Sequence, residues 1–435
     1  MKEKKVLPLV LTMSYPMAIS MAVNALYNIV DSFFVAQLDV KAMTALSLLF
    51  PVQNLSHSAA VGFAIGINAT VAFYLGQKNG ELADRAVSSG TLLSVIHGFM
   101  LTAVCIAVMP WFLSMFTDDT AITNYGIEYS QYVFLFAPMD CMFLTCEKIF
   151  QSTGRMKTTM FCLAAGCITN IILDPLMIFG IGPFPQLGIR GAAIATGIGQ
   201  SLPVLIYIAL YVLKPLPVRF RIQYCRPELY MIKRLYSIGN AATLNLALPS
   251  VQISVLNAIL SSFSSGYVFV LGVYYKLQTF LYLSANGVVQ GIRPLVGYNY
   301  GAGRNDRVRE IVKIATITVA CIMLAGTAVC LLIPARLMGI FTDDEAIISI
   351  GVSAIRIISA GFIISSLPVT LSGALEGLGK GTASLMISLI RYIIVILPLA
   401  FLLSRVSGAC GVWHAFWLTE IVAAAVSYLI YRVTA

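Results

Sequence analysis

The chain has 435 residues, of which 59% are hydrophobic and only 11% charged, and its mean hydropathy is +0.87. A soluble globular protein carries about 25% charged residues. A chain this apolar cannot hide its surface in one aqueous core, so we expect lipid to be its solvent. The formal net charge of +9 does not indicate a nucleic-acid partner, because most of the basic residues lie in short loops.

Apolar stretches long enough to cross a bilayer, about 20 helical residues each, recur along the whole chain. Twelve of them are predicted as spans: 9–37, 44–75, 90–112, 124–150, 158–181, 190–213, 236–262, 267–298, 311–333, 346–375, 382–404 and 410–431. No small-residue cleavage site follows the first stretch, so we expect an uncleaved span rather than a signal peptide. The nine cysteines form no Cys-x-x-Cys pair, and we expect them to act as small apolar residues rather than in disulfides or metal sites.

The positions of Lys and Arg predict the orientation of these spans. With the N-terminus inside, nineteen of them fall in or beside inner loops and four in outer loops. We therefore expect a multi-pass protein of the cell membrane, monomeric in the bilayer, with both termini in the cytoplasm. The most basic stretch, 214–235, would be a cytoplasmic linker between an N-lobe at 1–213 and a C-lobe at 236–435.

The chain contains an internal repeat at an offset of 225 residues. The string Phe-Thr-Asp-Asp at 116–119 returns at 341–344. Several glycines keep the same register, pairing Gly62 with Gly287, Gly66 with Gly291, Gly76 with Gly301, Gly126 with Gly351 and Gly154 with Gly379. Six spans return the chain to its starting side, so the halves share one topology. The predicted fold is an all-α membrane protein with 12 transmembrane helices in two six-helix pseudo-symmetric lobes around a central cleft.

Polar side chains at helical spacing interrupt the apolar spans of the first half. Span one carries the series Asn24, Tyr27, Asn28 and Asp31, whose i, i+3, i+4, i+7 spacing makes one polar face that cannot point at lipid. Span five carries Asn170 and Asp174 four residues apart, and span six carries Thr196 and Gln200 at the same interval. Pro175 follows Asp174 and leaves the Ile171 carbonyl without its helical partner.

The repeat provides a comparison for these polar groups. At the same offset Asp31 faces Leu256, Asn170 faces Val395, Asp174 faces Leu399, and Thr196 faces Ile421 or, in a shifted register, Phe416. Hydrogen bonds that only hold helices together are one explanation, but they would more plausibly occur in both halves. Two nearby buried carboxylates cannot both ionise cheaply without a cation or a proton, so Asp31 and Asp174 should titrate as a unit.

Other ionisable residues inside the spans are costly and are functional candidates by default. We expect Glu147, Arg293, Arg356 and Glu376 to lie near span ends and to extend their charges to the headgroups. In the second half, Lys276, Arg391 and Glu420 would either pair with one another or contact the substrate.

Three short motifs stand out: Asn-Ile-Val-Asp at 28–31, Asn-x-x-x-Asp-Pro at 170–175 and Val-Gly-Tyr-Asn-Tyr-Gly at 296–301. Together with the six-plus-six repeat, they resemble the MATE (multidrug and toxic compound extrusion) family over essentially the whole chain. The resemblance implies a secondary active antiporter that expels cationic, often aromatic drugs against inward flow of H+ or Na+ and needs no cofactor.

The resemblance also implies a cation or proton site at Asp31, Asn170, Asp174 and Thr196, where either H+ or Na+ would bind. Asn24, Tyr27 and Gln200 match positions that line the adjoining substrate cavity, and Asn28 lies on the same polar face. Pro16 matches a proline at which the first helix can bend. Family members that couple through the second lobe carry acids in spans seven and ten. Here span seven has none and Glu376 is expected near the cytoplasmic end, which favours coupling in the first lobe.

The mechanism that follows is alternating access, in which ion binding at Asp31 and Asp174 releases a cationic substrate outward. A flippase for a lipid-linked or anionic substrate is the alternative, because Lys276 and Arg391 could meet phosphate. A membrane-embedded enzyme is disfavoured, since the sequence has no His-Glu-x-x-His, Gly-x-Ser-x-Gly or Walker A motif. The sequence does not exclude a channel.

Overall fold

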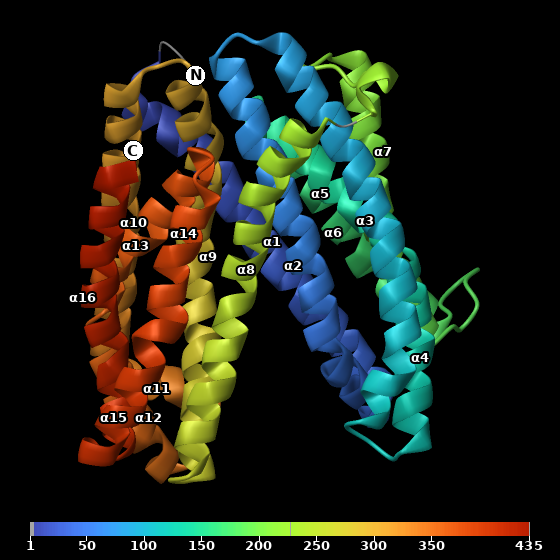
Figure 1. The fold of residues 1–435 in the computed structure, drawn as a ribbon. Coiled ribbons are helices and arrows are strands. Elements are labelled where there is room, and N and C mark those ends of the chain that lie inside the picture. Colours follow the sequence, from blue (N-terminus) through green and yellow to red (C-terminus); the bar gives the residue numbers. More distant parts are fainter. Residues whose placement is uncertain (1–3, 227, 435) are drawn as a thin grey trace. The chain divides into compact units, whose positions relative to one another are not determined.

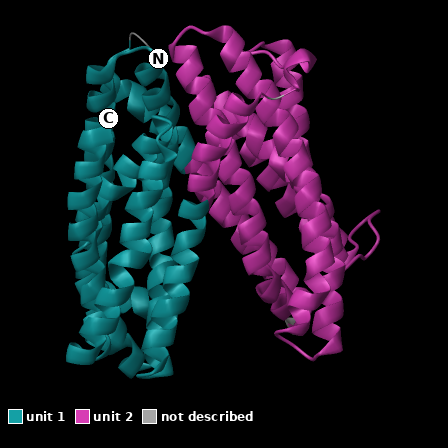
Figure 2. Ribbon diagram, viewed as in Figure 1, with its two compact units in different colours: residues 1–18, 244–435 teal, residues 19–243 magenta. Residues whose placement is uncertain are grey.

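The computed structural model describes residues 4–226 and 228–434, and all regular secondary structure in these ranges is helical. The chain forms two compact units, shown in Figure 2: unit 2 comprises residues 19–243, and unit 1 comprises residue 244 onward together with the chain up to Ala18. Two long helices therefore belong to both units. The helix that begins at Val6 crosses the boundary after Ala18, and the one that begins at Leu229 crosses it after Thr243.

The helices of the first half follow one another with short connections, and within each unit they run side by side (Figure 1). They are α1 (Val6–Leu38), α2 (Val40–Gly76), α3 (Gly80–Ser114), α4 (Thr120–Leu135), α5 (Ala137–Ser152), α6 (Met156–Phe179), α7 (Ile189–Leu213) and the 3-10 turn η1 (Ile222–Tyr224). The second half contains α8 (Leu229–Ser261), α9 (Ser265–Gly301), α10 (Asn305–Leu332), α11 (Pro334–Gly339), α12 (Glu345–Ser359), α13 (Phe362–Gly377), α14 (Gly381–Leu389), the π-helix η2 (Ile390–Ile394), α15 (Ile396–Ser407) and α16 (Ala409–Thr434).

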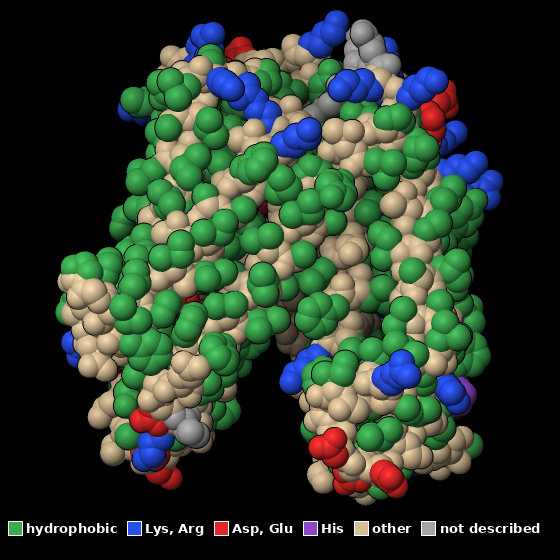
Figure 3. Space-filling model, turned by 180° about the vertical axis from the view of Figure 1, so that it is seen from behind, with side chains coloured by type: hydrophobic (Ala, Val, Ile, Leu, Met, Phe, Trp, Pro, Cys, Tyr) green, Lys and Arg blue, Asp and Glu red, His purple; other side chains and the backbone are tan. Residues whose placement is uncertain are grey.

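Ten helical segments in the described ranges are long and apolar enough to cross a membrane, and α12 with α13 makes an eleventh span that bends by 54°. The predicted span at 124–150 is α4 followed by α5, two helices of 16 residues each. Pro138 lies in the first turn of α5 and has no N–H to continue the ladder of α4, so the span is broken there. Hydrophobic side chains cover the lengths of the helices, and charged side chains gather at the helix ends (Figure 3).

The repeat is preserved in the backbone as well as in the sequence. The N-caps Asp119 of α4 and Asp344 of α12 both have φ −72° and ψ 110°, and each accepts from two backbone N–H groups of the next turn. In both copies the threonine two residues earlier accepts the N–H of the capping aspartate. The Phe-Thr-Asp-Asp strings therefore cap equivalent helices in the two halves. Lys41 also bonds to Asp119 and, with the cap N–H groups, holds the pKa of that carboxyl below its usual range.

The repeated glycines have a packing role that is equivalent in the two halves. A Cβ on Gly66 of α2 would lie 2.5 Å from the Leu235 carbonyl oxygen of α8. In the other unit, a Cβ on Gly291 of α9 would lie 2.7 Å from Cα of Ser14 on α1. Since no real Cβ tolerates such distances, these glycines are what allow two membrane helices to pack backbone against backbone.

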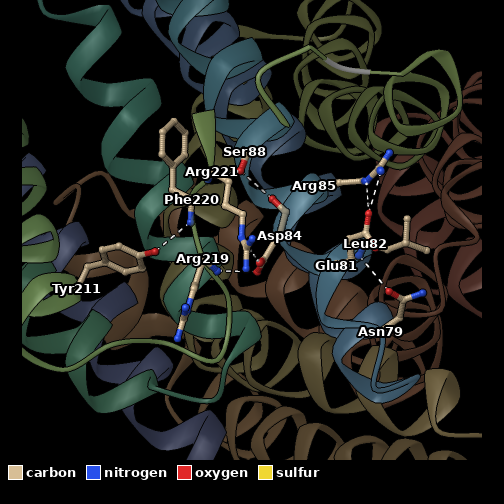
Figure 4. A network of polar contacts seen from close by, with 10 residues as sticks. All are labelled: Asn79, Glu81, Leu82, Asp84, Arg85, Ser88, Tyr211, Arg219, Phe220 and Arg221. Atoms are coloured by element: carbon tan, nitrogen blue, oxygen red, sulfur yellow. Dashed lines mark hydrogen bonds and ion pairs between the residues drawn. The ribbon is translucent and has the colours of Figure 1, made fainter. Parts of the chain in front are cut away.

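The basic linker is held against the first half by a buried carboxylate. Asp84 of α3 accepts the backbone N–H of Arg219 at 2.7 Å and Nε of Arg221 at 3.2 Å, and its side chain is only 9% exposed. Ser88 Oγ accepts the backbone N–H of Arg221, and the Tyr211 hydroxyl accepts that of Phe220 (Figure 4). The linker therefore folds as part of unit 2.

Three charges that were expected to extend to the headgroups are buried in ion pairs, so that prediction is wrong for them. Glu147 is 5% exposed, and its carboxylate lies 3.2 Å from the ammonium of its neighbour Lys148. Arg293 and Glu376 are 7% and 5% exposed and bridge α9 to α13 at 2.7 Å. These side chains point into their own unit and find a counter-charge there, whereas Arg356 is exposed as expected.

The cap of α12 gives a test of the repeat geometry. Replacing Asp344 with Ala leaves two backbone N–H groups without their acceptor, and we expect it to lower the free energy of unfolding by about 1 kcal/mol. Thermal unfolding of the purified protein measures this loss. The neighbouring exposed Asp343→Ala variant is the control, and an equal effect from both changes would show that the cap is not responsible.

Candidate functional site

The four residues predicted to bind an ion come together inside unit 2. Asp31 is on α1, Asn170 and Asp174 are on α6, and Thr196 is on α7. Nδ2 of Asn170 donates to Oδ1 of Asp174 at 3.2 Å and to Oγ1 of Thr196 at 3.4 Å. Asn170, Asp174 and Thr196 are 1%, 0% and 7% exposed. The Asn-x-x-x-Asp spacing puts both α6 side chains on the face that meets α1 and α7, so the site is enclosed by three helices.

The two carboxyl groups of this site face one another. Asp31 and Asp174 are close enough to share a hydrogen bond, which requires a proton on one of them. One oxygen each of Asp31, Asn170 and Asp174 is buried with no hydrogen-bond partner in the described structure. No Lys, Arg or His side chain in the described ranges forms an ion pair with either aspartate. The site therefore combines unbalanced negative charge with three unused oxygen acceptors, which is the chemistry that a proton or a hard cation satisfies.

Two tyrosine hydroxyls complete the polar cluster around Thr196. The hydroxyls of Tyr27 on α1 and Tyr129 on α4 both lie beside Thr196, and that of Tyr129 also lies beside Gln53 of α2. The sequence analysis found Tyr27 but missed Tyr129 and Gln53. The repeat could have revealed Tyr129, because the residue 225 positions on is Ala354.

The remaining polar residues predicted in the first half lie around this cluster. Asn28 is exposed and donates to the carbonyl of Asn24 at 2.7 Å, a bond within α1. Gln200 lies one turn beyond Thr196 on α7 and is half-buried. In the part of the chain that is described, none of these three side chains is hydrogen-bonded to the four ion-site residues. A substrate role for them remains a prediction.

The charged residues predicted in the second half separate into two groups. Arg391 donates through Nε to Glu420 at 2.8 Å and lies 2.7 Å from the same carboxylate through Nη2. It also donates to the hydroxyls of Tyr392 and Tyr282. Arg391 and Glu420 therefore pair internally, one of the two alternatives that the sequence left open. Lys276 is exposed and lies over the Phe341 ring, 5.6 Å from its centroid.

Arg391 lies on η2, a π-helical turn in which the N–H of Val395 reaches back to the carbonyl of Ile390 at 3.0 Å. Such a turn inserts one residue into an α-helix and rotates the side chains that follow, and it often marks functional positions. Here it separates α14 from α15, and the guanidinium stays 6% exposed.

Comparison with known proteins places this arrangement in a class and then in a family. Helices that span a membrane around an enclosed, charge-bearing polar site are typical of transporters. The MatE family model matches residues 16–176 and again residues 242–402, so the chain belongs to the MATE family. The two matches begin 226 residues apart, which agrees to within one residue with the internal repeat. Members of this family are transporters rather than enzymes.

Known relatives and solved structures agree with this assignment along the whole chain. Multidrug export protein MepA of Staphylococcus haemolyticus is 23% identical over 424 residues, covering 97% of this chain and 92% of its own. MepA of Staphylococcus aureus strain NCTC 8325 is 25% identical over 425 residues, covering 96% and 91%.

Two solved structures share the fold at low sequence identity. An outward-facing multidrug resistance MATE family transporter of the MOP superfamily has a TM-score of 0.89 at 23% identity, covering 100% of this chain and 98% of its own. A MOP superfamily transporter from Pyrococcus furiosus has a TM-score of 0.90 at 22% identity with the same coverage. The predicted family and the predicted all-α membrane fold are confirmed.

Replacing a carboxylate by an amide should have opposite effects on stability at the Asp31–Asp174 pair and at the Arg391–Glu420 pair. Asp174→Asn removes one of two like charges in a buried site, so we expect it to raise the melting temperature at pH 8.5 by roughly 2–4 °C. Glu420→Gln leaves Arg391 buried without its counter-charge, and we expect a loss of about 3–5 kcal/mol.

Thermal unfolding of both variants at pH 6 and pH 8.5 checks this contrast. The gain from Asp174→Asn should shrink at pH 6, because a shared proton already relieves the repulsion there. A destabilising Asp174→Asn at pH 8.5 would contradict the charge imbalance that we assign to the site.

Proposed function

We propose that the chain is a secondary active multidrug exporter that exchanges cationic, often aromatic compounds for inward-moving H+ or Na+. One observation carries this proposal: Asp31 and Asp174 have no basic partner in the described structure. The other buried carboxylates of the helices do have one, since Glu147 pairs with Lys148, Glu376 with Arg293 and Glu420 with Arg391. A structural role would not need unbalanced charge, whereas an exchanger needs a negative site that two cations take in turn.

The residues of the site divide this work between them. Asp31 and Asp174 hold the proton or Na+, while Asn170 orients Asp174 by donating to it and offers its own amide oxygen. Thr196 connects this group to the hydroxyls of Tyr27 and Tyr129. Loading the carboxylates removes negative charge and releases a cationic substrate, and unloading them restores affinity, so that ion and substrate exclude one another.

We propose that transport occurs by alternating access. In this mechanism α1 bends at Pro16, which acts as the hinge. Proline removes one backbone hydrogen bond from the helix interior and favours bending there. The division between the compact units falls after Ala18, two residues beyond Pro16 on the same helix. A bend at this proline would move Asn24, Tyr27 and Asp31 relative to α6 and α7.

We further propose that both chain termini and the basic linker face the cytoplasm of a cell membrane. Inner loops carry most of the basic residues in the predicted topology. The strings at 116–119 and 341–344 would then lie outside.

A flippase for an anionic or lipid-linked substrate is less well supported. It was suggested by Lys276 and Arg391, but Arg391 is neutralised by Glu420 and shared between two tyrosine hydroxyls. Only Lys276 remains to meet a phosphate. Cationic export therefore fits the charges of the chain better.

Loss of one carboxylate should uncouple the exporter. We expect Asp31→Asn to abolish gradient-driven export of a cationic dye such as ethidium, with at least about a tenfold loss of rate, because the site can no longer alternate its charge. Transport into inverted membrane vesicles measures it, and the exposed loop variant Asp118→Asn is the control. Full transport by Asp31→Asn would refute the proposal.

The same vesicles decide which ion is exchanged. If a pH jump without sodium drives dye uptake, the coupling ion is H+. If only a sodium gradient drives it, the ion is Na+, and the four oxygen-bearing residues form its site. Dye movement driven by neither gradient would contradict antiport.

A further inference from the structure

A second titratable pair lies inside unit 2 and has no part in the proposed ion site. Nδ1 of His57 on α2 is 3.2 Å from Oδ2 of Asp140 on α5. The Asp140 side chain is 15% exposed and that of His57 is 51% exposed. Both residues lie within predicted spans, where an ionisable group is costly and requires an explanation.

The repeat shows what this contact looks like without an imidazole and a carboxylate. The residues 225 positions on are Tyr282 and Ser365, on α9 and α13. They also touch, because the Tyr282 hydroxyl donates to Ser365 Oγ at 2.7 Å. The two halves therefore make the same helix-to-helix contact with different chemistry. In the second half two hydroxyl groups make this contact, and Arg391 also donates to the Tyr282 hydroxyl. Packing alone therefore does not require an imidazole and a carboxylate in the first half.

The asymmetry continues along α5. Glu147 is seven residues after Asp140, on the same helical face. It accepts from Gln151 at 2.7 Å and pairs with Lys148. The residue corresponding to Glu147 in the second half is Ser372, and the one corresponding to Lys148 is Gly373. Both acids on this face of α5 are thus serines in the repeat.

The neighbouring helices add few competing charges near His57. α2 packs against α3, α4 and α5 and, at Gly66, against α8, whose Arg234 lies over the rings of Phe73 and Tyr74. α5 contributes Asp140, Glu147 and Lys148 to the field at His57. On α3, His97 is hydrogen-bonded with Tyr236, while Glu81, Asp84 and Arg85 lie in the first turns and are paired. On α4, Glu128 is paired with Arg190.

We propose that His57 and Asp140 form a second proton-binding site in the first half of the chain, distinct from Asp31 and Asp174. The carboxylate of Asp140 holds Nδ1 of the imidazole. His57 takes up a proton from the solvent at its other ring nitrogen, Nε2, and the net charge of the pair rises by one. Protonation strengthens the contact between α2 and α5, and its loss weakens it. The broken span that contains α5 thereby responds to pH independently of substrate.

Histidine NMR tests proton binding directly, because the chain has only three histidines. His57→Gln identifies the His57 signal by its disappearance from the spectrum of the histidine-labelled protein. We expect that signal to titrate between pH 5.5 and 8.5. In Asp140→Asn its midpoint should shift to more acidic pH by about 1 unit, since the imidazolium loses its counter-charge. The Asp140→Asn substitution should leave the signals of His97 and His414 unchanged.

Failure of the His57 signal to titrate in this range, or an unchanged midpoint in Asp140→Asn, would overturn the proposal. The experiment does not depend on the identity of the coupling ion. Repeating it in Asp31→Asn separates the two sites, because the titration of His57 should survive the loss of the main carboxylate. A failed exporter with a titrating His57 would refute the proposed function and leave the second site standing.

A swap variant measures the consequence for the fold. His57→Tyr combined with Asp140→Ser transplants the neutral pair of the second half and keeps a hydrogen bond between α2 and α5. Lowering the pH from 8.5 to 6 should raise the melting temperature of the natural protein by roughly 2–4 °C relative to that of the swap variant. The reason is that only a protonated imidazole attracts the carboxylate. Glu128→Gln is the control. Parallel pH profiles for the natural protein and the swap variant would overturn the proposal.

Discussion

A carboxylate inside a bilayer needs a counter-charge, a proton or a cation, and the helices of this protein are arranged around that requirement. Most buried acids meet it with a fixed partner. Glu376 has Arg293, Glu420 has Arg391 and Glu147 has Lys148. Asp31 and Asp174 lie beside one another, and neither has a basic partner among the described residues. A mobile proton or cation must therefore balance their charge, and this distinguishes an exchange site from a structural ion pair.

The duplicated scaffold makes that distinction visible. Both halves keep the glycines that let helices touch and the aspartate caps that start α4 and α12. These are general needs of packing and of helix ends, so they recur at a fixed offset. The polar chemistry follows no such rule. The first half places Asp174 where the second has Leu399, and it places His57 and Asp140 where the second has Tyr282 and Ser365. The fold is shared, and the proposed ion binding is confined to one half.

Much of the fold could be predicted from the sequence because it follows from local rules. Span positions follow hydropathy, the caps follow a short motif, and the face shared by Asn170 and Asp174 follows helical spacing. The burial of Arg293 and Glu376 could not be predicted, because these partners are far apart in sequence: Arg293 meets Glu376 across 83 positions. Glu147 pairs with its neighbour Lys148, but its burial depends on which way α5 faces. Tyr129 was missed because its contact with Thr196 lies between two helices, although comparison with Ala354 in the repeat could have revealed it.

The most direct test of the account is the number of ions released when a cationic substrate binds. Purified protein in weakly buffered solution, with a pH indicator and a sodium-sensitive dye, would report H+ and Na+ released per bound cation. We expect about one ion to be released by the natural protein and by the exposed loop variant Asp118→Asn, and none by Asp174→Asn. Unchanged release from Asp174→Asn would contradict it, because the exchanged ion would then be bound elsewhere.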